Sequence, residues 1–134
     1  LGSGAGRLVA QVWLEVPAVQ HAIGVELAPS RHAAAVRAWT SALHSGSTKQ
    51  FKRSRLRDSP EFRLASMLHT DLSSVTHVYV ASLCMGDALM DALWSKLHLD
   101  APNLQVIATL RAFRGDAAAE ALSRVAVVDM TWNR

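Results

Sequence analysis

The sequence lacks the residue patterns that define several common classes of protein. Cys84 is the single cysteine in 134 residues, so an internal disulfide is excluded and no cysteine–histidine cluster indicates zinc. The six histidines are scattered, with no H-x-x-x-H pair and no acid partner, so no metal site and no catalytic triad is predicted. No apolar run reaches the roughly 20 residues of a membrane span, and no signal peptide opens the chain. These absences favour a domain of a reducing compartment with no membrane partner.

The net positive charge comes from one segment. The net charge is +3, yet five basic residues lie within nine positions, and without them the chain is net negative: Lys49, Lys52, Arg53, Arg55 and Arg57. The surrounding stretch, about 45–59, is polar and has no regular period, which predicts a loop. The run is either a solvated loop or a patch that faces the phosphates of a nucleic acid or nucleosomal partner.

Half of the residues are hydrophobic, which suits a single domain with a buried core over 1–134. Their spacing alternates between helical and extended periods along the chain. Helices are predicted over 6–15, from 29 to the basic loop, over 86–99 and over 116–122. Strands are predicted over 21–27, 62–69, 76–82, 104–110 and 124–132. This alternation predicts an α/β fold with a mostly parallel sheet and helices on both of its faces.

The chain opens on a glycine-rich segment, Leu1-Gly2-Ser3-Gly4-Ala5-Gly6-Arg7, that leads into the first predicted helix. Glycines at alternate positions let the chain turn tightly and bring bare backbone against a ligand, and the helix amides that follow face a polar group. A dinucleotide site usually has G-x-G-x-x-G, which would require glycine where Arg7 stands. The alternative is a glycine-rich linker or an expression scar.

A loop of this kind normally follows the first, central strand of a parallel sheet. No strand precedes it here, because the loop begins at Leu1. We therefore expect the sequence to be a fragment in which the first strand is missing.

A single acid closes the strand that follows the first helix. Glu26 stands 20 residues after Gly6, at the end of the apolar segment Gly24-Val25-Glu26-Leu27. A carboxylate in that position can accept hydrogen bonds from both ribose hydroxyls of a nucleoside. Ser3 and Leu27 are included in the predicted site as neighbours of the glycines and of Glu26. The alternative is a solvated glutamate at a strand end.

Two further segments follow predicted strands. Asp71 could accept a hydrogen bond from the amino group of an adenine while the Leu72 side chain packs on the adenine ring. The alternative is that Asp71 caps a helix or closes a turn. Ser82, in Ala81-Ser82-Leu83-Cys84-Met85, should lie near the reacting group, because ligands sit beyond the carboxyl ends of parallel strands. Cys84 has no evident histidine partner and is predicted to be a small buried residue rather than a nucleophile.

The motifs together resemble the class I methyltransferases, which use S-adenosyl-L-methionine and have a Rossmann-like fold. LGSGAGRLVAQV and GVELAPSRHAAAV, with VDMTWN near the end, are similar to the disruptor-of-telomeric-silencing family of histone lysine methyltransferases, which have no SET domain. The resemblance implies that the three glycines (Gly2, Gly4 and Gly6) contact the methionine part of the cofactor. It also implies that Glu26 binds the ribose of the cofactor and that Asp71 binds its adenine.

Two segments depart from the pattern of that family. Thr70-Asp71-Leu72 stands where the family usually has Gly-Asp-Phe, and Ala81-Ser82-Leu83 stands where it usually has an Asn-Asn-Phe turn. The resemblance implies methylation of a protein lysine, on a histone, in the nucleus. The alternatives are methylation of another protein, an RNA or a small molecule, with a cytoplasmic location, or an inactive domain that serves as a binding module.

Overall fold

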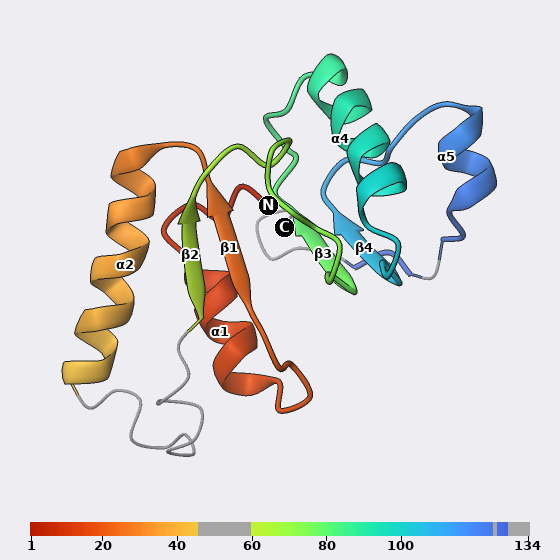
Figure 1. Cartoon of the computed structure of the whole chain (residues 1–134). Coiled ribbons are helices and arrows are strands. Elements are labelled where there is room, and N and C mark those ends of the chain that lie inside the picture. The colour runs from red at the N-terminus through yellow and green to blue at the C-terminus, as the bar shows by residue number, and fades with distance from the viewer. Residues whose placement is uncertain (46–59, 125, 129–134) are drawn as a thin grey trace.

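The structure is a computed structural model that describes residues 1–45, 60–124 and 126–128. Its helices and strands alternate along the chain, as Figure 1 shows. They are α1 (Arg7–Glu15), β1 (Ile23–Glu26), α2 (Pro29–His44), β2 (Glu61–Leu64), β3 (His77–Val80), α4 (Asp87–Asp100), β4 (Val106–Thr109) and α5 (Asp116–Ala121). The prediction of a mixed α/β architecture is confirmed at this level.

The boundaries of the helices follow from local sequence. Gly6 precedes α1 with a left-handed φ of 76°, a conformation that glycine adopts without steric cost. Pro29 opens α2, where its missing N–H costs no hydrogen bond. Asp87 lies in the first turn of α4, where a negative charge complements the helix dipole.

The strands form two parallel pairs. β1 pairs with β2 from Ile23–Glu61 to Glu26–Leu64, and β3 pairs with β4 from His77–Val106 to Val80–Thr109. In Figure 1 the chain start lies between the two pairs, and α2 packs beside β1 and β2. Within the described residues the strands therefore form two two-stranded sheets rather than the one continuous sheet that the sequence predicts.

Leu1 and Gly2 connect the two pairs through the backbone. The amino group of Leu1 donates to the Tyr79 carbonyl at 2.6 Å, and the Ala81 N–H donates to the Leu1 carbonyl at 3.1 Å. On the other side, the Gly2 N–H donates to the Val25 carbonyl at 2.9 Å. The start of the chain is thus hydrogen-bonded to β1 and to β3 at once.

The main hydrophobic core lies between α4 and the β3–β4 pair. Its buried members are Leu72, Val78, Val80, Leu93, Leu97 and Ala101, and Leu1 packs against them from the chain start. Leu93 and Leu97 come from one face of α4 and are at most 1% exposed. Burying a leucine side chain of this kind contributes roughly 1.5–3 kcal/mol to folding. In the part of the fold that contains the β1–β2 pair, the buried side chains include Trp13 of α1 and Trp39 of α2.

The strands are shorter than the apolar segments that predict them. β2 ends at Leu64, although its segment was expected to extend to His69, and residues 66–69 form a turn in which the His69 N–H donates to the Ser66 carbonyl. The predicted strand over 124–132 is wrong for its described residues (124 and 126–128), which lie in no strand. The basic residues from Lys49 to Arg57 lie outside the described residues. Within the described residues, no helix has the length and apolarity needed to cross a membrane.

Candidate functional site

The glycine-rich loop turns at the carboxyl end of β1. Gly2, Gly4 and Gly6 all have positive φ values, of 69°, 55° and 76°. The N–H groups of Gly2 and Ser3 both donate to the Val25 carbonyl, and the Gly6 N–H donates back to the Ser3 carbonyl. Because side chains rarely adopt this backbone conformation, the alternate glycines are required by the path of the chain. The segment is a structured loop, which argues against the alternative of a flexible linker.

The three glycines differ in what surrounds them. A Cβ on Gly6 would lie 2.5 Å from Phe62 Cε1 and 2.8 Å from the Ala35 Cβ, so the absence of a side chain lets the backbone before α1 lie close to both residues. A Cβ on Gly2 would make ordinary contacts with Met85 and Ala81. A Cβ on Gly4 would meet nothing within 4 Å. Gly4 is therefore the glycine whose bare backbone borders open space, where a ligand could approach.

Glu26 fastens the loop to the end of β1. Its Oε2 accepts the Gly4 N–H at 2.8 Å and its Oε1 accepts the Ala28 N–H at 2.9 Å, while the residue is only 7% exposed. Burial raises the pKa of the carboxyl group, but the amides of Ala28 and Gly4 and the positive charge of Arg31 together outweigh it and hold the pKa below its usual range. Glu26 is therefore an ionised carboxylate at neutral pH, and each oxygen retains a further acceptor position.

Exposed leucines lie at or just beyond the carboxyl ends of three strands. Leu27 comes directly after β1, Leu64 is the last residue of β2, and Leu83 lies three residues after β3, with exposed fractions of 68%, 51% and 62%. The carboxyl ends of parallel strands lie at the same end of a sheet, so Leu27 and Leu64 lie together at that end of the β1–β2 pair. Apolar side chains next to a carboxylate suit a ligand with both an aromatic ring and hydroxyl groups.

Asp71 and Leu72 lie in different environments. Asp71 is exposed, and its Oδ1 accepts the Ser73 N–H at 2.9 Å in a turn. The hydrogen bonds from Ser73, with the charges of Arg63 and Lys96, hold the pKa of Asp71 below its usual value. Leu72 is 3% exposed and packs in the main core. A ligand beside Asp71 would therefore meet the backbone of Leu72 rather than its side chain.

Ser82 is the buried centre of a polar network after β3. It is 0% exposed, its hydroxyl lies 2.8 Å from Thr109 Oγ1, and it accepts the Arg111 N–H at 2.8 Å. The Arg111 guanidinium in turn donates to the Met85 carbonyl and to Asp87. The Ser82 hydroxyl therefore joins the loops after β3 and β4. The prediction that Cys84 is buried is wrong: Cys84 is exposed, and it lies within the turn that the Met85 N–H closes by donating to the Ser82 carbonyl.

Sequence reasoning missed Thr109 and Arg111. Thr109 ends β4 and Arg111 lies two residues beyond it, 27 and 29 residues after Ser82. No local sequence pattern marks either residue. The one signal that could have predicted the contact is that Ser82 and Thr109 each place a hydroxyl at the carboxyl end of one of two adjacent parallel strands, because such ends lie close together.

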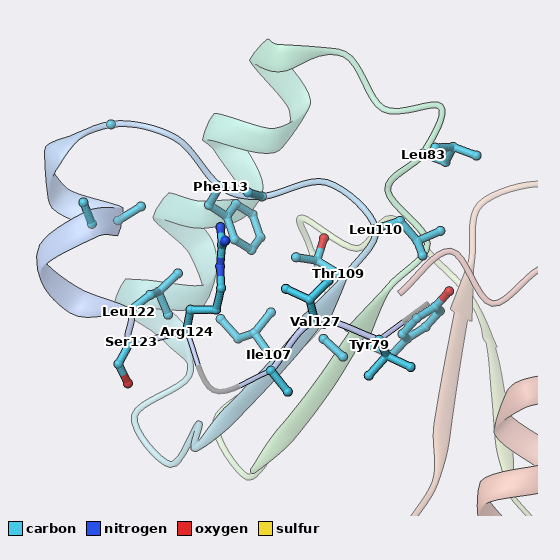
Figure 2. Close-up of a pocket in the computed structure, with 17 residues that line it drawn as sticks. Tyr79, Leu83, Ile107, Thr109, Leu110, Phe113, Leu122, Ser123, Arg124 and Val127 are labelled. Carbon is cyan, nitrogen blue, oxygen red and sulfur yellow. The ribbon is translucent and has the colours of Figure 1, made fainter. Parts of the chain in front are cut away.

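A separate hollow lies between the β3–β4 pair and α5 (Figure 2). It encloses about 860 Å³ and is lined mainly by apolar side chains, among them Tyr79, Ile107, Phe113, Leu122 and Val127. Among the described residues, none of those from the glycine loop or from β1 lines it. Nor do the described residues contain a group of three histidine, cysteine or acidic side chains suited to a metal ion.

No protein-family model matches the chain, and neither a curated protein nor a solved structure matches it significantly.

Proposed function

We propose that the chain binds S-adenosyl-L-methionine at the glycine loop and serves as the cofactor-binding core of a class I methyltransferase. The observation that carries the proposal is the contact between Gly4 and Glu26. An ionised carboxylate at the end of β1 is held by the amide of a glycine whose other side borders open space. The same few residues thus supply a hydroxyl acceptor and a close backbone surface.

The residues present fit the parts of this cofactor. The free acceptor positions of Glu26 suit the two ribose hydroxyls, and the exposed side chain of Leu27 suits one face of the adenine. Asp71 has an exposed carboxylate that suits the adenine amino group. Gly4, beside which no atom lies within 4 Å of a built Cβ, borders the space proposed for the methionine part. When bound, the cofactor would supply an activated methyl group to a nucleophile.

The fold proposed for this site is a single Rossmann-like sheet. The support is the start of the chain, where Leu1 is bonded to β3 and Gly2 is bonded to β1. A parallel sheet with this order of pairs would place the glycine loop at its centre, between β1 and β3. The loop enters α1 at Arg7, without the later glycine of a dinucleotide site, which favours S-adenosyl-L-methionine over NAD.

The proposed acceptor is a lysine of a histone, in the nucleus. This part of the proposal is supported by the family resemblance of the sequence and by the basic run from Lys49 to Arg57, which would suit nucleosomal phosphates. Methyl transfer depends on alignment of the nucleophile with the methyl group more than on acid–base groups. The absence of a catalytic pair among the predicted residues agrees with that chemistry.

Calorimetry with S-adenosyl-L-methionine tests the cofactor. The Glu26→Ala variant should weaken binding about 10²-fold, because hydrogen bonds to a charged group contribute roughly 1.5–3 kcal/mol each. Leu27→Ala should weaken it about 5-fold without affecting folding, because the side chain is 68% exposed in the free protein. Glu15→Ala, on the exposed end of α1, is the matched control.

The wild-type chain should bind S-adenosyl-L-methionine and not NAD. No heat with millimolar S-adenosyl-L-methionine, or equal binding by the wild-type and Leu27→Ala chains, would contradict the proposed site.

Transfer of labelled methyl groups tests the acceptor. Nucleosomes, free histones and RNA are offered in parallel, and label should enter histone lysine. Label in RNA alone would refute the histone acceptor and leave the cofactor site intact.

A further inference from the structure

The hydrogen bonds around Ser82 form a closed ring of three residues. Thr109 Oγ1 donates to the Arg111 carbonyl at 2.7 Å, so its proton is committed and the Ser82 hydroxyl must donate to Thr109 Oγ1. Ser82 Oγ in turn accepts the Arg111 N–H at 2.8 Å. Because Ser82 is fully buried and its proton is used inside the ring, any effect of Ser82 on a bound substrate passes through its neighbours.

The side chain of Arg111 extends this ring to the start of α4. Its guanidinium group donates to the Met85 carbonyl and to the Asp87 carboxylate. The hydrogen bond from Arg111, with the charges of Arg111 and Arg114, holds the pKa of Asp87 below its usual value, so the pair stays ionised at neutral pH. Arg111 therefore holds the connection from β3 to α4 at two places, with its backbone at Ser82 and with its side chain at Met85 and Asp87.

Between these two places lies a turn formed by residues 82–85, which we call the 82–85 turn. The Met85 N–H donates to the Ser82 carbonyl at 3.0 Å and closes the turn. Its two central residues, Leu83 and Cys84, are exposed, and Figure 2 shows Leu83 at the surface of this loop. Exposed turns are held by few contacts of their own, so the orientation of the 82–85 turn depends on the groups that hold its ends.

The 82–85 turn and the residue before it lie next to the glycine loop. A Cβ on Gly2 would lie 3.6 Å from Met85 Cε and 3.7 Å from the Ala81 Cβ, and the Ala81 N–H donates to the Leu1 carbonyl at 3.1 Å. The methionine part of the cofactor is proposed to lie at the glycine loop. A turn adjacent to that loop would border the side of the site on which the methyl group is transferred.

We propose that Arg111 is a positioning residue for the methyl acceptor. By holding Ser82 and Asp87 together, Arg111 fixes the 82–85 turn beside the glycine loop, and the turn forms the wall against which the acceptor is aligned. Arg111 acts through the turn and does not contact the reacting atoms. The acceptor role rests on the proposed function, whereas the hold of Arg111 on the turn does not. Because methyl transfer depends on alignment, loosening the turn should slow transfer without loss of the cofactor.

Arg114 provides the matched control. Its Nη1 lies 4.0 Å from Asp87 Oδ2, and its side chain is exposed. Arg114 thus shares the charge of Asp87, whereas Arg111 makes the bonds to Ser82 and Met85. The variants to compare are Arg111→Met, Arg111→Lys and Arg114→Met, each studied at a temperature below its thermal midpoint so that all chains are folded.

The single cysteine allows the motion of the turn to be measured. Cys84 is exposed in the 82–85 turn, so a thiol-specific nitroxide label reports on that turn alone. Electron paramagnetic resonance should show restricted label motion in the wild-type and Arg114→Met chains. Arg111→Met should add a mobile component that rotates at least about threefold faster. Arg111→Lys, which retains the positive charge, should give a smaller mobile component.

Methyl transfer by the unlabelled chains separates the acceptor from the cofactor. With free histones as the acceptor, Arg111→Met should lower kcat/KM for the acceptor about tenfold or more, and Arg111→Lys should recover part of that loss. The Kd for S-adenosyl-L-methionine, measured by calorimetry, should change less than about twofold in both variants. Arg114→Met should match the wild-type chain in both measurements.

The outcomes that overturn the proposal are distinct from those that overturn the proposed function. Identical nitroxide spectra for Arg111→Met and Arg114→Met, or equal kcat/KM values, would refute the positioning role. A parallel loss of cofactor affinity in Arg111→Met would also refute it, because Arg111 would then support the glycine loop rather than the acceptor. No heat from the wild-type chain with S-adenosyl-L-methionine would contradict the proposed function and the acceptor role together, while the nitroxide spectra would still show whether Arg111 holds the turn.

Discussion

Replacing Gly6 by alanine should destabilise the fold more than replacing either of two other glycines. The new methyl group would lie 2.5 Å from Phe62 Cε1 and 2.8 Å from the Ala35 Cβ. The phenyl ring can rotate away, but the Ala35 methyl group is fixed to the backbone of α2. Overpacking of this kind costs roughly 1–3 kcal/mol, and a left-handed φ adds roughly 1–2 kcal/mol for a side chain.

The expected loss in the free energy of unfolding for Gly6→Ala is therefore about 2–5 kcal/mol. Gly4→Ala has the same left-handed backbone with no neighbour within 4 Å, so it should lose only the conformational part, about 1–2 kcal/mol. Gly86→Ala has a φ of −71° and open space around it, and it should lose less than about 0.5 kcal/mol.

Urea denaturation followed by circular dichroism measures all three variants. Phe62→Leu added to Gly6→Ala should recover part of the loss, because it removes the nearest atom. If Gly6→Ala were no less stable than Gly4→Ala, the close approach of Gly6 to Phe62 and Ala35 would be refuted.

Three further predictions concern charge and the buried polar network. The pKa of Glu26 is lower in the folded than in the unfolded chain, so its contribution to the free energy of unfolding is present above the unfolded value of about 4.3 and is lost as the pH falls through the folded pKa. Urea titrations at pH 3–7 should therefore show that Glu26→Gln loses less stability at acid pH than the wild-type chain. Equal acid sensitivity would contradict the pKa direction. Ser82→Ala should lose about 1–3 kcal/mol in urea because it leaves the Arg111 N–H buried without its acceptor, and a loss below about 0.5 kcal/mol would argue against the network. Arg111 and Arg114 both pair with Asp87, but Arg111 also donates to the Met85 carbonyl. Arg111→Met should therefore lower the thermal midpoint more than Arg114→Met. Equal effects would show that Arg111 does not link the loops after β3 and β4.

Helix positions could be predicted from the sequence with little error. Pro29 opens α2 as expected, and the predicted helix over 86–99 corresponds to Asp87–Asp100. Helices are specified by local signals such as caps, glycine and proline, together with one apolar face, and all of these are present in the sequence itself.

Strand ends and pairing could not be predicted in the same way. The apolar segment over 62–69 continues past Leu64, but β2 stops where the Ala65 N–H makes its last bond to the Glu26 carbonyl. The length of a strand depends on a partner that is distant in the sequence. The same reason explains why the two parallel pairs, rather than one sheet, could not be foreseen.

The sequence indicated that the glycine loop and Glu26 lie together, but not the contacts that each residue makes. Glycine spacing and the distance to Glu26 indicated that they belong together, and the structure joins Gly4 to Glu26 directly. The division between Gly4, which borders open space, and Gly6, which contacts Phe62, depends on how α1 packs. The burial of Leu72 likewise depends on α4, which follows it in the chain.

Nuclear magnetic resonance titration with S-adenosylhomocysteine, the demethylated form of the cofactor, tests the central claim most directly. The amide shifts should be largest in the glycine loop, at Gly4, and just beyond β1, at Leu27 and Ala28. They should be small around the hollow near α5, for example at Ile107. Shifts concentrated around that hollow, or no shifts at millimolar concentration, would contradict a nucleoside site at the glycine loop.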